Sequence, residues 1–328
     1  MDSLICAFNS VSPIIFTVTV GYFLKKLGLM NADFSKKANK LVFRVFLPVM
    51  LFLNIYGIES MSLVSFDYVL YALVSLLILF GLAIPLVIFL TDKRNCRGAL
   101  LQAVFRSNYA LIGIPLASSL FPGDGAAVAT LLSAFMVPAF NTLAVIGLSI
   151  FNNDGEKPNF KKILLGILKN PLILGIAAGL VALGIRAIFV ELDISFRISE
   201  IPAVWNTMKN LSNIATPLAL LVLGAQFEFS AIPSLKREII CGVILRSVIV
   251  PLLGIGVAYL AFRGSFSGAQ FAALVAVFCT PVAVSSVPMA QEMGADAELA
   301  GQLVVFTTLT SAFTVFITSF LLRLAGIF

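Results

Sequence analysis

The chain alternates between long apolar segments and short polar connections. A helix needs about 20 apolar residues to cross the hydrocarbon core of a bilayer, and the segments lack the two-residue alternation of barrel strands. Ten of them meet the helical criterion, and they cover residues 5–24, 38–57, 68–91, 98–120, 126–151, 171–190, 207–229, 238–262, 268–291 and 300–323. The pattern therefore predicts an all-α integral membrane protein with ten transmembrane helices.

The fourth and ninth segments contain residues that are poorly suited to an unbroken helix. These residues are Asn108, Gly113 and Pro115 in the fourth, and Thr280, Pro281, Ser285, Ser286 and Pro288 in the ninth. Proline removes a backbone donor and frees a carbonyl, which hydrocarbon cannot satisfy, so such breaks persist only where they line a cavity or are buried in protein.

Two readings of these breaks are open. Proline kinks and small residues can simply let helices pack closely. Alternatively, two broken helices cross near the midplane and direct half-helix N-termini, which favour anions, at a ligand. Because the breaks recur in both halves of the chain, we favour a substrate-binding site at the crossing.

The two halves are predicted to be repeats, residues 1–151 and 171–328, joined by a polar cytoplasmic linker at 152–170. Four prolines recur in order at offsets between 158 and 169 residues, namely Pro13 with Pro171, Pro48 with Pro217, Pro85 with Pro251 and Pro115 with Pro281. Each half holds five segments, an odd number, so the second must enter the membrane from the opposite side. The fold expected is a five-plus-five inverted repeat.

Composition and charge agree with a membrane protein and suggest its orientation. The chain is 60% hydrophobic and 12% charged, which excludes an ordinary soluble domain of this size. With the N-terminus outside, sixteen of the 22 Lys and Arg residues fall on the cytoplasmic side, Arg106 among them, five fall outside and Arg246 lies within a span. This positive-inside bias predicts a multi-pass membrane protein with both termini outside.

The sequence offers little for catalysis. Histidine is absent and the four cysteines are scattered, so neither His-dependent nucleophilic catalysis nor a metal site is expected. A membrane-embedded enzyme is therefore a poor alternative. No Asp or Glu lies deep in a span, which disfavours a carboxylate proton relay. We expect no cofactor, and coupling to Na⁺ or H⁺ is left open.

Four further polar residues are candidates. Asn141 lies in the middle of the fifth segment, where it either contributes to the site or joins helices. Asn54 and Gln226 lie near segment ends and read as interfacial, with a coupling or gating role as the alternative. Arg246, about eight residues into its segment, is either functional or long enough to reach the cytoplasmic surface.

Five motifs resemble the prokaryotic auxin efflux carrier family over nearly the whole chain. They are Asn108-x-x-x-x-Gly113-Ile-Pro115, Val137-Pro-Ala-Phe-Asn141, Lys169-Asn-Pro171-Leu-Ile-Leu-Gly175, Pro217-Leu-Ala-Leu-Leu-Val-Leu-Gly224-Ala-Gln226 and Thr280-Pro281-Val-Ala-Val-Ser-Ser. That family includes bacterial permeases for malate and malonate and is related to the plant PIN auxin carriers. The resemblance implies crossed helices four and nine, a scaffold of helices 1, 2, 6 and 7, and a mobile transport domain of helices 3–5 and 8–10. It also implies that Asn108 helps bind a carboxylate.

We therefore expect a secondary transporter of a small organic anion that works by elevator-type alternating access. Its substrate would be a mono- or dicarboxylate such as malate or malonate, or an auxin-like acid. The alternative within transport is a sodium-coupled symporter of a larger amphipathic acid. The expected partners are the substrate anion and membrane lipid, with no nucleic acid, and a homodimer is compatible with the sequence.

Overall fold

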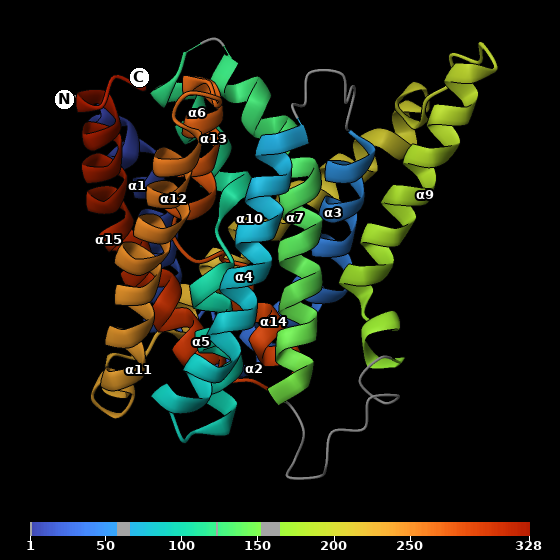
Figure 1. The fold of residues 1–328 in the computed structure, drawn as a ribbon. Helices are drawn as coiled ribbons and strands as arrows, with labels where there is room; N and C mark the ends of the chain where they lie inside the picture. The colour runs from blue at the N-terminus through green and yellow to red at the C-terminus, as the bar shows by residue number, and fades with distance from the viewer. Residues whose placement is uncertain (1, 58–65, 123, 152–164) are drawn as a thin grey trace.

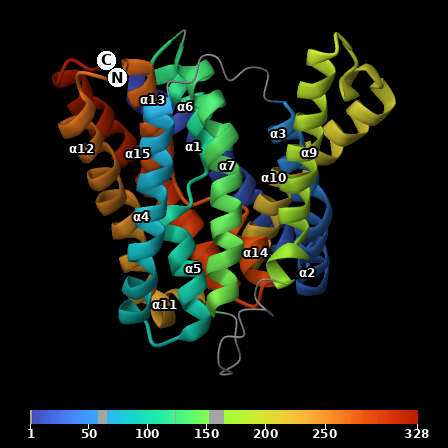
Figure 2. The same cartoon turned by 45° about the vertical axis from the view of Figure 1, so that its right-hand side comes forward.

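The computed structural model describes residues 2–57, 66–122, 124–151 and 165–328, and over these it is all-helical. Figures 1 and 2 show long helices that run roughly side by side, with short helices between them. The helices are α1 (Asp2–Lys26), α2 (Ala32–Leu41), η1 (Val42–Phe46), α3 (Leu47–Tyr56), α4 (Phe66–Leu90), α5 (Arg94–Phe105), η2 (Tyr109–Gly113), α6 (Ile114–Leu120), α7 (Asp124–Phe151), α9 (Pro171–Glu191), η3 (Ile198–Glu200), α10 (Pro202–Gln226), η4 (Phe229–Ala231), α11 (Ile232–Ile244), η5 (Leu245–Ile249), α12 (Val250–Phe262), α13 (Gly268–Phe278), α14 (Ser286–Glu292) and α15 (Ala297–Leu324).

The length and apolar composition of individual helices confirm the prediction of a helical membrane protein. Among the described residues, six helical stretches are long and apolar enough to cross a bilayer, namely Ala32–Tyr56, Phe66–Leu90, Asp124–Phe151, Pro171–Glu191, Phe229–Phe262 and Ala297–Leu324. The other four predicted spans correspond to α1, α10 and the two interrupted helices. The count of ten crossings therefore stays a prediction.

Three of the helices contain a wide π turn, and each of these turns is followed by a proline. The turn ends two residues before Pro48 in η1, before Pro115 in η2 and before Pro251 in η5. Proline cannot donate to the carbonyl four residues earlier, and its ring crowds that carbonyl, so the helix widens locally. At Pro251 the freed carbonyl belongs to Ser247, and it accepts a hydrogen bond of 2.9 Å from the hydroxyl of Thr314.

Helix starts follow the polar caps in the sequence. Asn31 caps α2, Asn170 caps α9 just before Pro171, and Asp296 caps α15, in each case by accepting a backbone N–H near the first turn. Ser267 and Gln270 form a reciprocal capping box at the start of α13. These caps satisfy backbone donors that a helix start would otherwise leave without a partner.

Close packing of α1 against α10 depends on glycine. A Cβ atom at Gly21 would overlap the backbone of Leu221, and one at Gly224 would overlap the backbone of Val18. Small residues of this kind allow helix backbones to approach within a membrane, where packing contributes much of the association energy. Farther along the bundle, α3 packs against both α9 and α10.

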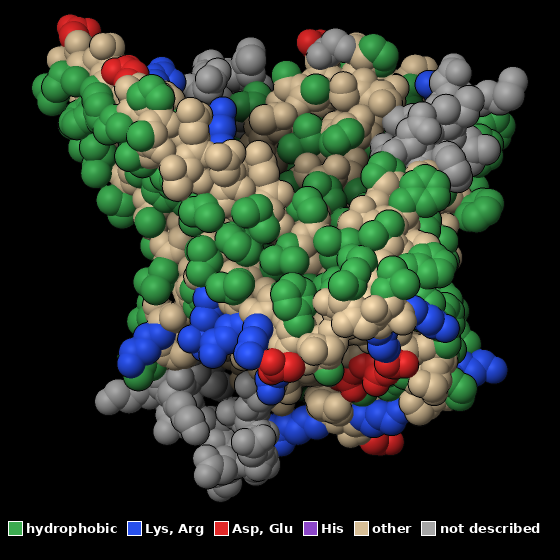
Figure 3. Space-filling model, turned by 180° about the vertical axis from the view of Figure 1, so that it is seen from behind, with side chains coloured by type: hydrophobic (Ala, Val, Ile, Leu, Met, Phe, Trp, Pro, Cys, Tyr) green, Lys and Arg blue, Asp and Glu red, His purple; other side chains and the backbone are tan. Residues whose placement is uncertain are grey.

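The outer surface carries a wide apolar belt. Large hydrophobic side chains on α4 and α12 point outward, and Phe89 and Leu260 are 82% and 81% exposed. Figure 3, which shows the molecule from behind, has hydrophobic side chains across the middle of that face too, above a zone where Lys and Arg side chains gather at one end of the molecule. The two chain ends lie at the opposite end, as Figure 1 shows. The belt fits a lipid-facing surface, and the charge gradient agrees with the asymmetry expected from the sequence.

Candidate functional site

The two predicted breaks meet in the middle of the molecule. One helix is interrupted between α5 and η2, and the other between α13 and α14. The two interruptions form an antiparallel bridge between Ser107 and Val282, in which the Asn108 N–H donates to the Pro281 carbonyl at 2.8 Å. We call this meeting point, residues 106–108 and 279–285, the crossing. Each break thus supplies a backbone partner to the other, in keeping with the need to satisfy backbone groups at membrane depth.

Arg106 lies at the crossing and not in a cytoplasmic loop, so its inclusion in the cytoplasmic charge count was wrong. Its side chain is 1% exposed. One terminal nitrogen donates to Asn141 Oδ1 at 2.7 Å and Ser285 Oγ at 2.8 Å, and the other to Gln102 Oε1 at 2.7 Å. It also contacts the hydroxyl of Ser286, at 3.4 Å.

All of these partners are electrically neutral. Among the described residues, no carboxylate lies within ion-pair distance of Arg106. Burying a guanidinium without an opposite charge costs several kcal/mol even when it is hydrogen-bonded. A bound anion would remove that cost.

A cavity of about 220 Å³ adjoins this guanidinium. Its polar lining includes Arg106, Asn108, Asn141 and Ser285, and Arg106 carries the only charge among the described residues that line it. The rest is mostly apolar and comes from α3, η2, α7, α10 and the crossing itself. The cavity thus combines one cationic and several amide and hydroxyl side chains with a mostly hydrophobic lining.

Asn108 lines this cavity and carries an unused hydrogen-bond donor. Its residue is 9% exposed, and its buried Nδ2 has no partner among the described residues. Asn141 differs, because its Nδ2 donates to the Val137 carbonyl at 2.8 Å while its Oδ1 accepts from Arg106. Asn141 therefore both joins elements and lines the cavity, whereas Asn108 lines it with an amide whose nitrogen has no hydrogen-bond partner among the described residues.

The remaining predicted crossing residues shape the backbone. Gly113 packs against α13, where a Cβ atom would lie 3.1 Å from that of Ala276. Pro115 opens α6 and is exposed, outside the cavity lining. Thr280 is buried and donates its hydroxyl to the Ala276 carbonyl, and Pro281 supplies the carbonyl of the bridge.

Arg246 does not extend to the surface, so the interpretation that its side chain reaches the cytoplasmic surface was wrong. It is 1% exposed in η5. Its guanidinium donates to the carbonyls of Thr280 at 2.8 Å, Val277 at 2.9 Å and Val104 at 3.3 Å. It therefore lies behind the crossing, where α5 and α13 both end, and it does not line the cavity.

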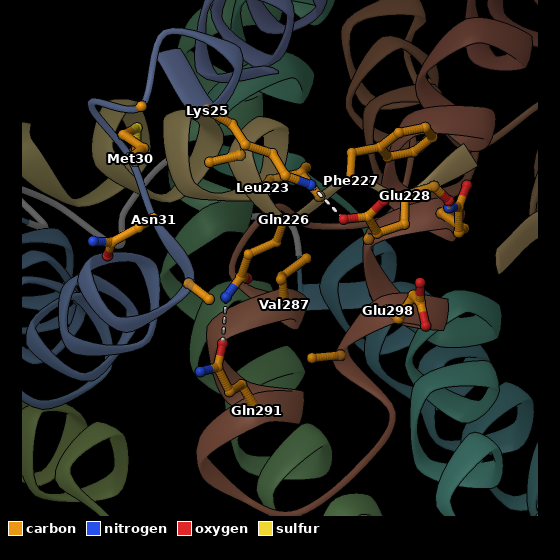
Figure 4. Close-up of a pocket in the computed structure, with 16 residues that line it drawn as sticks. Lys25, Met30, Asn31, Leu223, Gln226, Phe227, Glu228, Val287, Gln291 and Glu298 are labelled. Carbon is orange, nitrogen blue, oxygen red and sulfur yellow. Dashed lines mark hydrogen bonds and ion pairs between the residues drawn. The ribbon is translucent and has the colours of Figure 1, made fainter. Parts of the chain in front are cut away.

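Asn54 and Gln226, both read as interfacial from the sequence, have different surroundings. Asn54 is exposed on α3 and lines the crossing cavity. Gln226 lines a second cavity of about 470 Å³, bounded by the ends of α1 and α10 and by α14 and α15. In Figure 4 the Gln226 amide points toward Gln291 of α14, to which it donates at 3.3 Å.

This second cavity is closed on one side by a polar contact between helices. Asn39 of α2 donates to both Gln226 and Gln291. Arg44 approaches Glu292 within 3.6 Å, and Lys25 pairs with Glu228. The contacts of Gln291 and Glu292 tie the end of α14 to α2, η1 and α10, and the Lys25–Glu228 pair joins the end of α1 to the segment that follows α10. Each partner is distant in sequence, so the pairing could not be predicted from the position of Gln226 near a segment end.

An all-helical, lipid-facing fold in which two interrupted helices meet beside a polar cavity is a transporter architecture. Comparison with known proteins agrees. A family model described as membrane transport protein matches residues 6–319. An uncharacterized transporter from Methanothermobacter thermautotrophicus is 23% identical over 317 residues, covering 92% of this chain and 94% of the relative. The chain belongs to the membrane transport protein family, the auxin efflux carrier family that its motifs resemble.

Proposed function

We propose that this membrane transporter carries a small organic anion and binds it at the crossing. The observation that carries the proposal is Arg106, a buried guanidinium at the wall of a cavity, which has no acidic partner in the part of the chain that the structure describes. Asn108 supports it with a free amide donor at the same wall. A carboxylate placed there would pair with Arg106 and accept from Asn108, two charge-assisted hydrogen bonds that are stronger than neutral ones.

The lining favours a monocarboxylate with an apolar body over a dicarboxylate such as malate or malonate. One cationic side chain faces the cavity among its described lining residues, and much of the remaining lining is aliphatic or aromatic, as at Leu51, Val137 and Phe140. A second carboxylate would lose its hydration without gaining an opposite charge, which is costly in a low-dielectric site. The volume of about 220 Å³ favours a small acid.

We further propose that transport follows an elevator mechanism within a five-plus-five inverted repeat. The cavity is lined on one side by α3 and α10, from the proposed scaffold, and on the other by the crossing and α7, from the proposed transport domain. A substrate at this boundary can be carried when one group moves against the other. The contacts of Gln291 with Asn39 and Gln226 would then hold the molecule closed at its Lys/Arg-rich end.

For the orientation we propose the bacterial inner membrane, with this Lys/Arg-rich end in the cytoplasm and both chain ends outside. The exposed Lys236 and Arg237 lie at the start of α11, near the basic end of the bundle. The exposed Arg263 follows the other end of the same span.

The test combines binding with transport. The purified protein is screened by thermal shift against aliphatic and aromatic monocarboxylates, malonate and malate, because a ligand that favours the folded state raises its melting temperature. Acids that bind are then tested for uptake into proteoliposomes. We expect Arg106→Gln to weaken binding by about 10- to 100-fold, the equivalent of losing a hydrogen bond between charged groups.

The matched control is Arg237→Gln, which removes the same charge from an exposed position on α11. It should bind like the parent. If Arg106→Gln also binds every acid as tightly as the parent, or if no acid binds the parent at all, the proposed site is wrong.

A further inference from the structure

Arg246 is a second buried guanidinium, and the anion site described above does not use it. Arg246 contacts the crossing without lining the cavity, and it donates to three backbone carbonyls, those of Val104, Val277 and Thr280. Two of these carbonyls belong to the last turns of α5 and α13, and the third lies in the break itself. Arg246 thus joins both interrupted helices through their unpaired carbonyl ends.

The partial negative charges at the carbonyl ends of α5 and α13 explain why a cation is needed beside them. The carbonyl end of a helix carries a partial charge of about −0.5, so the two ends together amount to about −1. That charge would repel an anion bound at the crossing. The guanidinium of Arg246 adds a full positive charge at 2.8 to 3.3 Å from three of the oxygens. The ends are therefore neutralised, and Arg106 is left as the uncompensated charge that the anion meets.

Carbonyl oxygens of this kind are also a sodium site in other transporters. Where a membrane helix is broken, its carbonyl end and the unwound carbonyls beside it can coordinate a coupling Na⁺. In this protein the carbonyls of Val104, Val277 and Thr280 already accept hydrogen bonds from Arg246. A sodium ion placed among them would both displace those bonds and face a fixed positive charge.

We propose that Arg246 is a built-in cation that takes the place of sodium at the crossing, so that anion binding there is independent of Na⁺. The inference deepens the proposed function, since it concerns the coupling of the same site. Arg246 is a positioning residue, because it acts on the substrate only through the two helix ends and does not line the cavity.

The first test uses sodium alone as the probe and needs no substrate. The melting temperature of the purified parent is measured in NaCl, KCl and choline chloride at equal ionic strength. We expect the same value in all three salts. A rise that is specific to Na⁺ would overturn the proposal, because any ion that binds the folded state preferentially stabilises it.

The second test removes the built-in cation. Arg246→Ser should melt at a lower temperature, and NaCl should restore about 3 °C or more that KCl and choline chloride do not. Arg246→Lys keeps the charge, so it should show no response to Na⁺. Arg237→Ser, exposed on α11, is the control and should match the parent in every salt. If Arg246→Ser folds but does not respond to Na⁺, the carbonyls are not a latent cation site and the proposal is wrong.

If Arg246→Ser does not fold, the test rests on the parent and Arg246→Lys. In both proteins a cationic side chain should already occupy the carbonyls, so stabilisation of either one by Na⁺ alone would contradict the proposal. A final arm uses an acid that binds the parent, and compares its affinity in NaCl and choline chloride. Affinities within twofold are expected, whereas a loss of tenfold or more without Na⁺ overturns the proposal. If no acid binds, the proposed function fails by itself, while the sodium measurements still test Arg246.

Discussion

Replacing Asn108 by Leu should weaken anion binding without harming the fold, and this contrast tests the site most directly. The buried Nδ2 of Asn108 has no partner among the described residues, so the substitution removes no side-chain hydrogen bond from the folded protein. Its backbone bonds remain available, since the N–H donates to Pro281 and the carbonyl accepts from Ile112. The backbone φ of −81° is open to any residue.

The substitution should affect the melting temperature and the binding affinity in different ways. A buried polar group without a partner costs about 1–3 kcal/mol, so its removal should leave the melting temperature unchanged or raise it. A hydrogen bond from the same amide to a carboxylate contributes about 1.5–3 kcal/mol, and its loss weakens binding by about 10- to 100-fold. General damage to the bundle would instead lower both stability and affinity.

The assay measures affinity and melting temperature on the same purified variant, with the acid that binds the parent best. Asn141→Leu provides the contrast, since it removes two bonds, one of 2.7 Å from Arg106 and one of 2.8 Å to the Val137 carbonyl. It should lower the melting temperature. Parent-like affinity in Asn108→Leu, or a melting temperature that falls as it does in Asn141→Leu, would refute the assignment of Asn108.

Two further predictions concern the fold and its orientation. Gly224→Ala should lower the melting temperature because its Cβ meets the backbone of α1, whereas Gly81→Ala, in open space on α4, should leave it unchanged or raise it. Equal effects of these two substitutions would argue against the close approach of α1 and α10. In a cysteine-free background, Lys236→Cys should be shielded from an impermeant thiol reagent outside intact cells, and Arg263→Cys should react; the reverse pattern would invert the topology.

The sequence predicted the breaks well because they depend on local chemistry. Proline and small polar residues inside an apolar segment exclude a continuous helix wherever the chain packs, and the structure interrupts both segments near Asn108 and Pro281. Arg106 was missed although a signal existed. It lies inside the predicted span 98–120, two residues before Asn108, where a charge is costly unless it has a role.

The remaining site contacts depend on tertiary structure. Whether Arg246 reached the surface or turned inward could not be decided from its distance to a segment end, because a long side chain can do either. The choice is made by the carbonyls of Val104 and Val277, on two other helices. Gln226 is a similar case, since its partners Asn39 and Gln291 come from opposite halves of the chain.

The wide turn η5 also changes the phase of its helix. Gly242 and Ala258, on either side of it, are both buried. Sixteen residues at about 100° each would leave the second about 160° round the helix from the first, on the lipid side. A turn that holds about one extra residue reduces this angle to about 60°. The buried face of this helix therefore has to be identified separately on each side of the turn. A single helical period fitted to the whole span would assign some buried residues to the lipid-facing side.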